Sequence, residues 1–113
     1  MSAITTHILD VARGRPAGGV PVVLEHESAG EWTEIGSGRT DGDGRLKDLL
    51  ADDFALTAGR YRLTFDTAAY FFAQQTESFY PAVTIAFIVR DEAEHYHVPL
   101  LLSPYGYSTY RGS

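Results

Sequence analysis

Two histidines near the end of the chain are spaced so that they could act together. His95 and His97 are separated by one residue, and residues two apart in a β-strand point to the same face of a sheet. Tyr96, Val98 and the leucines that follow would share the opposite, apolar face. We therefore expect both imidazoles to point away from the core, where they could transfer protons near neutral pH or bind zinc. The spacing alone favours a third interpretation, a solvated pair.

A third histidine and an arginine are candidates of the same kind in other parts of the chain. His7 alternates with neighbours that suit the core face of a strand, so its ring is expected on the other face. The segment Asp41-Gly42-Asp43-Gly44-Arg45 starts like a calcium loop, but the fifth and sixth positions lack the acidic or amide residue and the glycine that such a loop requires. We interpret it as a tight turn that places Arg45 at the start of the next element. The guanidinium of Arg45 suits carboxylates or an imide oxygen, although such a residue taken alone is more often a surface charge.

The C-terminal segment is the most unusual part of the sequence. Residues 105–113 are aromatic and polar, and they end in Tyr110-Arg111-Gly112-Ser113. A strand that stops there places a phenol, a guanidinium and the carboxylate of Ser113 close together, whereas most chain ends consist of charged or small residues. The alternative is an edge strand with a short tail.

Composition indicates one ordinary folded domain, expected to span residues 1–113. Of the 113 residues, 44% are hydrophobic and 21% are charged, which is typical of a globular protein with one core. No cysteine is present, so disulfides and cysteine-based zinc sites are excluded. The net charge of −6 and the lack of a lysine or arginine block argue against nucleic acid as a partner.

Sequence motifs exclude several other classes of protein. There is no apolar run long enough to cross a bilayer, no secretory signal and no peroxisomal address, so we expect a cytoplasmic protein without a membrane partner. The chain has no Walker loop, no dinucleotide-binding fingerprint and no His-Glu-x-x-His motif. A serine nucleophile is not supported, because the residues around Ser108 lack the second glycine of a nucleophile elbow.

Short runs of β-branched and aromatic residues, separated by glycine and proline turns, indicate an all-β sandwich of seven or eight strands. The alternation is clearest in Arg60–Asp66, where Tyr61, Leu63 and Phe65 point to one side. The strands are expected at Ala3–Leu9, Val20–Glu27, Glu31–Gly38, Arg60–Asp66, Val83–Arg90, His95–Ser103 and Tyr105–Tyr110.

Two segments depart from the simple strand pattern. Thr67–Gln75 contains alanines and glutamines and is expected to form one short helix, capped by Asp66 or Thr67. Val83–Val89 is apolar on both faces, which a half-solvated sandwich strand is not. We expect this strand either to lie centrally under the helix or to meet another chain with its outer face, so the residues already suggest oligomerisation.

Three separated motifs occur in one order along the chain. They are Thr6-His7-Ile8-Leu9-Asp10 with Gly14, Pro16 and Ala17, then Thr40-Asp41 with Gly44-Arg45, and finally the segment from His95 to Ser113. Together they resemble the signature of the 5-hydroxyisourate hydrolases of the transthyretin-like family. The Tyr-Arg-Gly-Ser ending resembles the mark that separates these enzymes from transthyretin proper. The resemblance covers essentially the whole chain.

The resemblance implies a fold and an assembly. The fold is a two-sheet β-sandwich of about eight strands with one short helix. The assembly is a homotetramer, a dimer of dimers with a central channel, in which the sites lie where the two dimers meet. Neither a cofactor nor a catalytic metal is implied.

The resemblance also implies a reaction and a site. The reaction is hydrolysis of 5-hydroxyisourate at its N1–C6 bond, which yields 2-oxo-4-hydroxy-4-carboxy-5-ureidoimidazoline in urate degradation. One histidine of the His7/His97 pair would take a proton from water, and Arg45 would stabilise the developing negative charge. Tyr110 would hydrogen-bond or stack on the heterocycle, and the Ser113 carboxylate could orient an imidazole. The implied site residues are His7, Arg45, His97, Tyr110, Arg111, Gly112 and Ser113, with His95 as an accessory whose role is open.

Two other functions stay open. The first is a carrier of transthyretin type, which would bind a small aromatic ligand in the channel without chemistry, because a fold does not determine a function. A hydrophobic ligand channel does not require His7, Arg45 and His97, so these residues favour the enzyme. The second is a structural or adhesive sandwich module, which predicts a monomer. A zinc ion on His95 and His97 remains open as a secondary feature.

Overall fold

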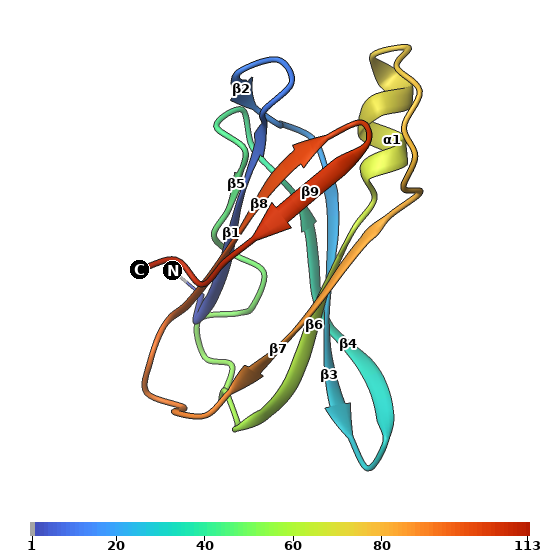
Figure 1. The fold of residues 1–113 in the computed structure, drawn as a ribbon. Coiled ribbons are helices and arrows are strands. Elements are labelled where there is room, and N and C mark those ends of the chain that lie inside the picture. The colour runs from blue at the N-terminus through green and yellow to red at the C-terminus, as the bar shows by residue number, and fades with distance from the viewer. Residues whose placement is uncertain (1) are drawn as a thin grey trace.

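Two β-sheets packed face to face, with one short helix at one end, make up the fold (Figure 1). The computed structural model describes residues 2–113, and in that range it contains nine strands and one helix. The predicted all-β sandwich with one short helix is confirmed, and the sequence had not predicted the two-residue strands β2 and β5. The elements are β1 (Ile4–Asp10), β2 (Arg15–Pro16), β3 (Pro21–Ser28), β4 (Glu31–Arg39), β5 (Arg45–Leu46), β6 (Gly59–Phe65), α1 (Thr67–Ala73), β7 (Val83–Val89), β8 (Tyr96–Ser103) and β9 (Gly106–Thr109).

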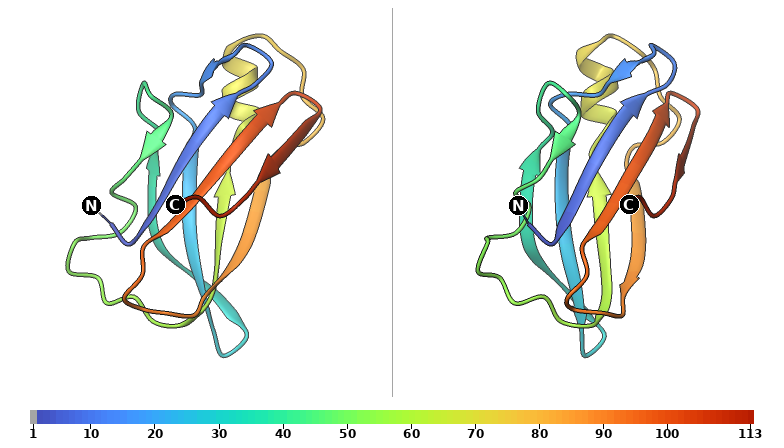
Figure 2. Two further views of the ribbon diagram at one scale, coloured as in Figure 1. Left: turned by 60° about the vertical axis from the view of Figure 1, so that its left-hand side comes forward. Right: turned by 90° about the vertical axis from the view of Figure 1, so that its left-hand side faces the viewer.

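The first sheet has the strand order β2-β1-β8-β9, with β5 also paired to β1. Figure 2 shows β1, β8 and β9 side by side on one face of the molecule. β1 and β8 run parallel, in a register that extends from Ile4 opposite Tyr96 to Asp10 opposite Leu102. This pairing brings the first and last parts of the chain together.

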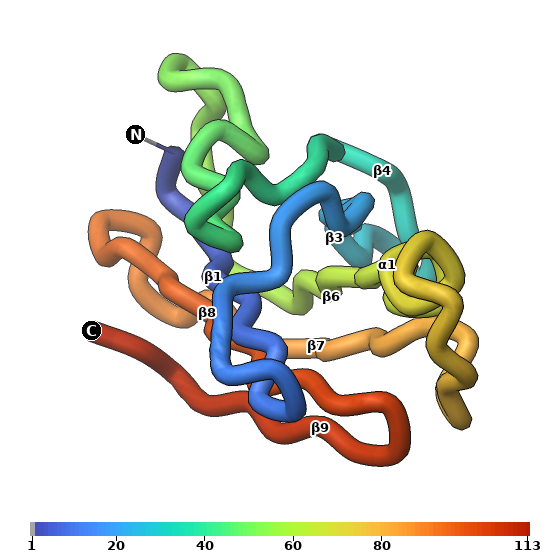
Figure 3. The backbone as a smooth tube through the Cα atoms, turned by 90° about the horizontal axis from the view of Figure 1, so that it is seen from above, coloured from blue at the N-terminus to red at the C-terminus, as the bar shows by residue number. Residues whose placement is uncertain are grey.

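The second sheet has the order β4-β3-β6-β7, and its strands are antiparallel. Seen from above, the two sheets form two layers (Figure 3). The predicted alternation of β6 is confirmed, because Tyr61, Leu63 and Phe65 are fully buried. They belong to one core cluster with Ile8 and Leu100 of the first sheet. Full burial of such an apolar side chain stabilises the fold by about 2 kcal/mol.

The helix α1 begins where the sequence predicts it. Asp66 is the cap, and its carboxylate accepts a hydrogen bond from the Ala69 N–H at 3.1 Å. Tyr70 donates from its hydroxyl to the buried Asp10 of β1 at 2.8 Å, which ties the helix to the first sheet. Burial, followed by the contact with Asp10, raises the pKa of Tyr70, so its phenol stays a donor. In the described part of the chain, no helix is long and apolar enough to span a membrane.

The apolar strand β7 lies at the edge of its sheet. The sequence left two options for Val83–Val89, a central position under the helix or an outer face covered by another chain. The central position is wrong, because β7 ends the order β4-β3-β6-β7. Val83 and Val89 are buried at the ends of the strand, whereas Ile88 is 49% exposed. The second option, contact with another chain, stays a prediction.

The turn before β5 depends on Asp41 and Gly44. The backbone N–H groups of Arg45 and Asp43 donate to the Asp41 carboxylate at 3.0 and 2.8 Å, and the bond from Arg45 contributes most to lowering the pKa of Asp41. Gly44 has a φ of +76°, and a Cβ on it would lie 2.3 Å from the carbonyl oxygen of Ile8. The interpretation of this segment as a tight turn is confirmed, since Arg45 begins β5.

Gly44→Ala is expected to lower the free energy of unfolding by about 3 kcal/mol, because a methyl group there is strained and collides with backbone. Urea denaturation followed by circular dichroism measures the difference. Gly42→Ala is the matched control, because a Cβ on Gly42 would have nothing within 4 Å, and its effect should stay within about 0.5 kcal/mol. Equal losses in the two variants would contradict this account of the turn.

Candidate active site

The outward face of the first sheet gathers the polar residues that the sequence singles out. In the parallel register Thr5 lies opposite His97 and His7 lies opposite Pro99. The antiparallel pairing of β5 with β1 places Arg45 opposite His7. Because alternate residues of a strand share a face, these side chains lie together on the side away from the core. The intervening residues of β8 are buried, as the predicted alternation requires.

A cavity of about 290 Å³ opens on this face. It is lined by β1, β5, β8 and the segments that flank them, through Thr5, Thr6, Arg45, Lys47, His95, His97 and Ser113. Two cations therefore stand beside two imidazoles in a space suited to a small polar heterocycle. Of the predicted site residues, the structure brings Arg45, His95, His97 and Ser113 together in this cavity.

Among the described residues, His97 has a hydrogen-bond partner at one ring nitrogen only. Its Nδ1 lies 2.8 Å from the hydroxyl oxygen of Thr5, and within residues 2–113 no hydrogen bond reaches Nε2. Partial burial lowers the pKa of His97, and the positive charges of Arg45, His7 and His95 lower it further. A neutral imidazole can accept a proton, so His97 is suited to act as a base near neutral pH.

His7 is oriented by the turn that also carries Arg45. Its Nε2 lies 2.9 Å from the backbone carbonyl oxygen of Asp43. Because a carbonyl oxygen only accepts hydrogen bonds, Nε2 of His7 must carry a proton and donate it. The nitrogen of His7 that remains for other contacts is Nδ1. One turn thus fixes both His7 and Arg45.

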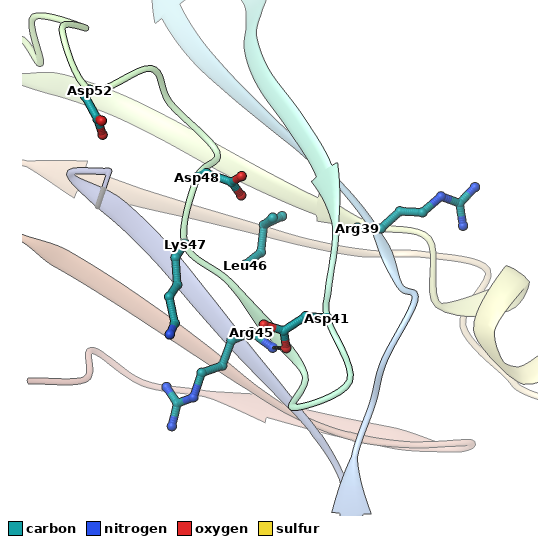
Figure 4. Close-up of a pocket in the computed structure, with 7 residues that line it drawn as sticks. All are labelled: Arg39, Asp41, Arg45, Leu46, Lys47, Asp48 and Asp52. Carbon is teal, nitrogen blue, oxygen red and sulfur yellow. Dashed lines mark hydrogen bonds between the residues drawn. The ribbon is translucent and has the colours of Figure 1, made fainter.

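Arg45 stands between two cavities. Besides the histidine cavity, it lines one of about 640 Å³ together with Arg39 and Asp41. Figure 4 shows Arg45 and Lys47 extending in the same direction and Leu46 in the other, and Leu46 is buried in the core. The alternation of this segment therefore places Lys47 beside Arg45, where both line the histidine cavity.

Gly112 lies against the ring of His97. Its N–H donates to the His97 carbonyl at 2.8 Å, in an isolated bridge that continues the sheet. A Cβ on Gly112 would lie 2.6 Å from Cδ2 of His97 and 3.3 Å from Cγ of Pro99. Any side chain at this position would displace the imidazole, so the glycine of the terminal motif has a steric role.

Tyr110 and Arg111 are not part of the histidine cavity in one chain. Both line a separate cavity of about 250 Å³, together with residues of β7. The guanidinium of Arg111 lies 4.6 Å from the centre of the Tyr96 ring and donates to the Glu94 carboxylate at 3.1 Å. These contacts occupy Arg111 at the edge of the sandwich. Substrate binding by Tyr110 and Arg111 stays a prediction.

Thr5 and Lys47 also line the histidine cavity, although no sequence motif marks them. Each lies two positions from a predicted site residue, Thr5 from His7 and Lys47 from Arg45, so the period of two in a strand could have indicated both. Among the described residues, no group of three or more metal-binding side chains surrounds a common point. His95 and His97 therefore have no third metal-binding side chain beside them among the described residues.

The fold and this polar cavity define a transthyretin-like β-sandwich that carries histidines and an arginine on the outward face of one sheet. The model of the HIUase/Transthyretin family matches residues 4–112, so the chain belongs to this family and the predicted resemblance is confirmed.

Three known proteins show how close the similarity is. The chain is 49% identical to a probable 5-hydroxyisourate hydrolase of Caenorhabditis elegans, over 99% of this chain and 82% of that protein. It is 40% identical to the 5-hydroxyisourate hydrolase of Klebsiella pneumoniae, whose structure matches with a TM-score of 0.81 over 97% of this chain and 92% of that chain. Sea bream transthyretin in complex with thyroxine matches with 35% identity and a TM-score of 0.91, over 98% of this chain and 95% of that chain.

In an NMR pH titration, His97 is expected to titrate below the ordinary histidine pKa of about 6.5, because burial and its positive neighbours disfavour the imidazolium. Arg45→Gln removes one of those charges and is expected to raise the pKa of His97. Arg60→Gln is the control, because Arg60 belongs to the second sheet. This variant should leave the titration of His97 unchanged. An unchanged pKa of His97 in the Arg45→Gln variant would contradict the electrostatic coupling between Arg45 and His97.

Proposed function

We propose that this chain hydrolyses 5-hydroxyisourate at its N1–C6 bond and yields 2-oxo-4-hydroxy-4-carboxy-5-ureidoimidazoline in urate degradation. The observation that carries the proposal is the set of His7, Arg45 and His97 on one outward face, beside a cavity of about 290 Å³. The similarity to the hydrolases of C. elegans and K. pneumoniae extends over nearly the full chain and supports the same activity. The activity expected from the sequence agrees with both.

His97 is the general base in this proposal. Its Nε2 takes a proton from water while the water oxygen attacks the C6 carbonyl carbon, and the N1–C6 bond then breaks as N1 receives that proton. The lowered pKa of His97 keeps the ring neutral to lower pH, so the rate should fall only as the pH drops below about 6.5. His7 is less suited to this step because it does not line the cavity, whereas His97 does. The Nδ1 of His7 is proposed to hold the substrate.

Arg45 and Lys47 supply positive charge where the reaction develops negative charge. Attack on C6 converts a carbonyl oxygen to an oxyanion, and bond cleavage leaves a carboxylate. A fixed guanidinium stabilises the oxyanion, because its donors are already in place. Lys47 lines the same cavity and is proposed to attract the product carboxylate. Ser113 also lines the cavity, and the carboxylate expected on it is proposed to orient an imidazole.

A ligand carrier is the less favoured alternative. It rests on the structural match with sea bream transthyretin, which binds thyroxine. The histidine cavity of this chain gathers imidazoles and cations, which binding of an aromatic ligand without chemistry does not require. The lining therefore favours hydrolysis over carriage.

Adding the protein to freshly generated 5-hydroxyisourate should accelerate its decay, which ultraviolet absorbance follows. Arg45→Ala is expected to lower kcat by about 100-fold, the usual effect of losing one donor to an oxyanion. Arg60→Ala, on the second sheet, should keep wild-type kinetics. Absence of acceleration by the folded wild-type protein would overturn the proposed activity.

We further propose that the chain assembles as a homotetramer, a dimer of dimers. β7 is an edge strand with an exposed Ile88, and β9 forms an edge of the other sheet. Edge strands with apolar exposure favour pairing with another chain. Where the protein resides is a separate question, and the cytoplasmic location expected from the sequence stays a prediction.

Size-exclusion chromatography with light scattering should give a mass four times the 12.4 kDa of one chain. Ile88→Glu is expected to lower that mass, because a charge on the outer face of β7 opposes burial between subunits. Phe72→Glu is the matched control, since it places the same charge at an exposed apolar residue of α1. This variant should keep the mass of the wild-type assembly. A monomeric wild-type protein would overturn the assembly.

A further inference from the structure

The hydroxyl of Thr5 lies between two imidazoles. Its Oγ1 is 2.8 Å from Nδ1 of His97 and 3.2 Å from Nε2 of His95. Thr5 is only 4% exposed, so water competes little for these contacts. The register of β1 and β8, which places Thr5 opposite His97, holds the hydroxyl in this position. The branched Cβ of threonine limits its rotation further.

The proton positions of these three groups are coupled because a hydroxyl donates only one hydrogen bond. If Thr5 donates to His95, it accepts from His97, whose Nδ1 must then carry the ring proton. If Thr5 donates to His97 instead, the proton of a neutral His97 must sit on Nε2. The nitrogen left for the substrate is a base in the first case and an acid in the second.

We propose that Thr5 is a positioning residue that selects the Nδ1-protonated tautomer of His97 and so presents Nε2 as the base. The inference rests on the proposed function, in which His97 takes a proton from water. The hydrogen bonds run from Nδ1–H of His97 to Oγ1 of Thr5, and from the Thr5 O–H to Nε2 of His95. His95, an exposed residue beside the cavity, thereby acts as the acceptor for the Thr5 hydroxyl.

Both directions of the hydrogen bonds give the buried hydroxyl proton of Thr5 an acceptor, so the state of His97 during the reaction favours the proposed one. When Nε2 of His97 takes a proton, its Nδ1–H can keep donating to Thr5. The ring then keeps its orientation for returning the proton to N1. A third group that orients the base is a general feature of such catalysis.

Nitrogen-15 NMR of the full chain with labelled histidine tests the tautomer directly. At about pH 8, where histidines are neutral, two-bond proton–nitrogen correlations show which ring nitrogen carries the proton. The wild-type protein should show His97 protonated at Nδ1. Thr5→Val, which removes the hydroxyl and keeps the shape, should shift the proton toward Nε2. Thr5→Ser retains a hydroxyl and should keep the wild-type tautomer.

Kinetics of the same variants provide the second readout. Thr5→Val should lower kcat by about tenfold to 100-fold, with KM changed much less, since Thr5 acts on the base and not on substrate binding. Thr5→Ser should restore most of kcat. Thr64→Val is the matched control, because it removes a threonine hydroxyl from β6 in the other sheet and should change neither readout.

The outcomes separate this proposal from the proposed function. A wild-type His97 protonated at Nε2, or a Thr5→Val variant with unchanged tautomer and kcat, would overturn the role of Thr5. The expected tautomer in a protein without hydrolase activity would support the role of Thr5 in setting the tautomer and would overturn the proposed function. If Thr5→Val does not fold, the ring nitrogen that carries the proton in wild-type His97 still tests the proposal, because protonation at Nε2 would overturn it.

Discussion

The parallel pairing of β1 with β8 is the contact on which the candidate site depends. It joins residues 4–10 to residues 96–102, and it sets which side chains stand opposite one another on both faces. On the inner face it aligns Ile4 and Ile8 with Tyr96 and Leu100, which are buried. A shift by one residue would exchange the faces and bury polar groups in the core. The same apolar packing that stabilises the sandwich therefore also fixes the geometry of the site.

The candidate site gathers positively charged groups, although the whole chain is negatively charged. The protein carries a net charge of −6, yet the histidine cavity gathers Arg45, Lys47 and two imidazoles. Crowding positive groups in one place disfavours protonation of His97, so the ring remains a base beside cations that attract an anion. The acidic residues that balance this charge lie largely elsewhere, and Asp41 uses its carboxylate to build the turn that carries Arg45.

Much of the fold and part of the site follow from sequence patterns alone. Alternation within one strand predicts the core face of β6 and the outward direction of His97, because it depends only on neighbours along the chain. The edge position of β7, the role of Thr5 beside His97 and the steric reason for Gly112 depend on pairings between distant strands, which no local pattern specifies. For the same reason the sequence does not indicate that Tyr110 lines a different cavity from His97.

The pairing of β1 with β8 also affects how the chain folds during translation. Until residues 96–102 have been synthesised, β1 can pair only with the two-residue strands β2 and β5. Its apolar residues Ile4 and Ile8, which are fully buried in the folded protein, lack their main partner until β8 has been synthesised. Non-local contacts of this kind are slow to form and leave apolar strands exposed. The nascent chain thus carries an aggregation risk at β1 until β8 has emerged.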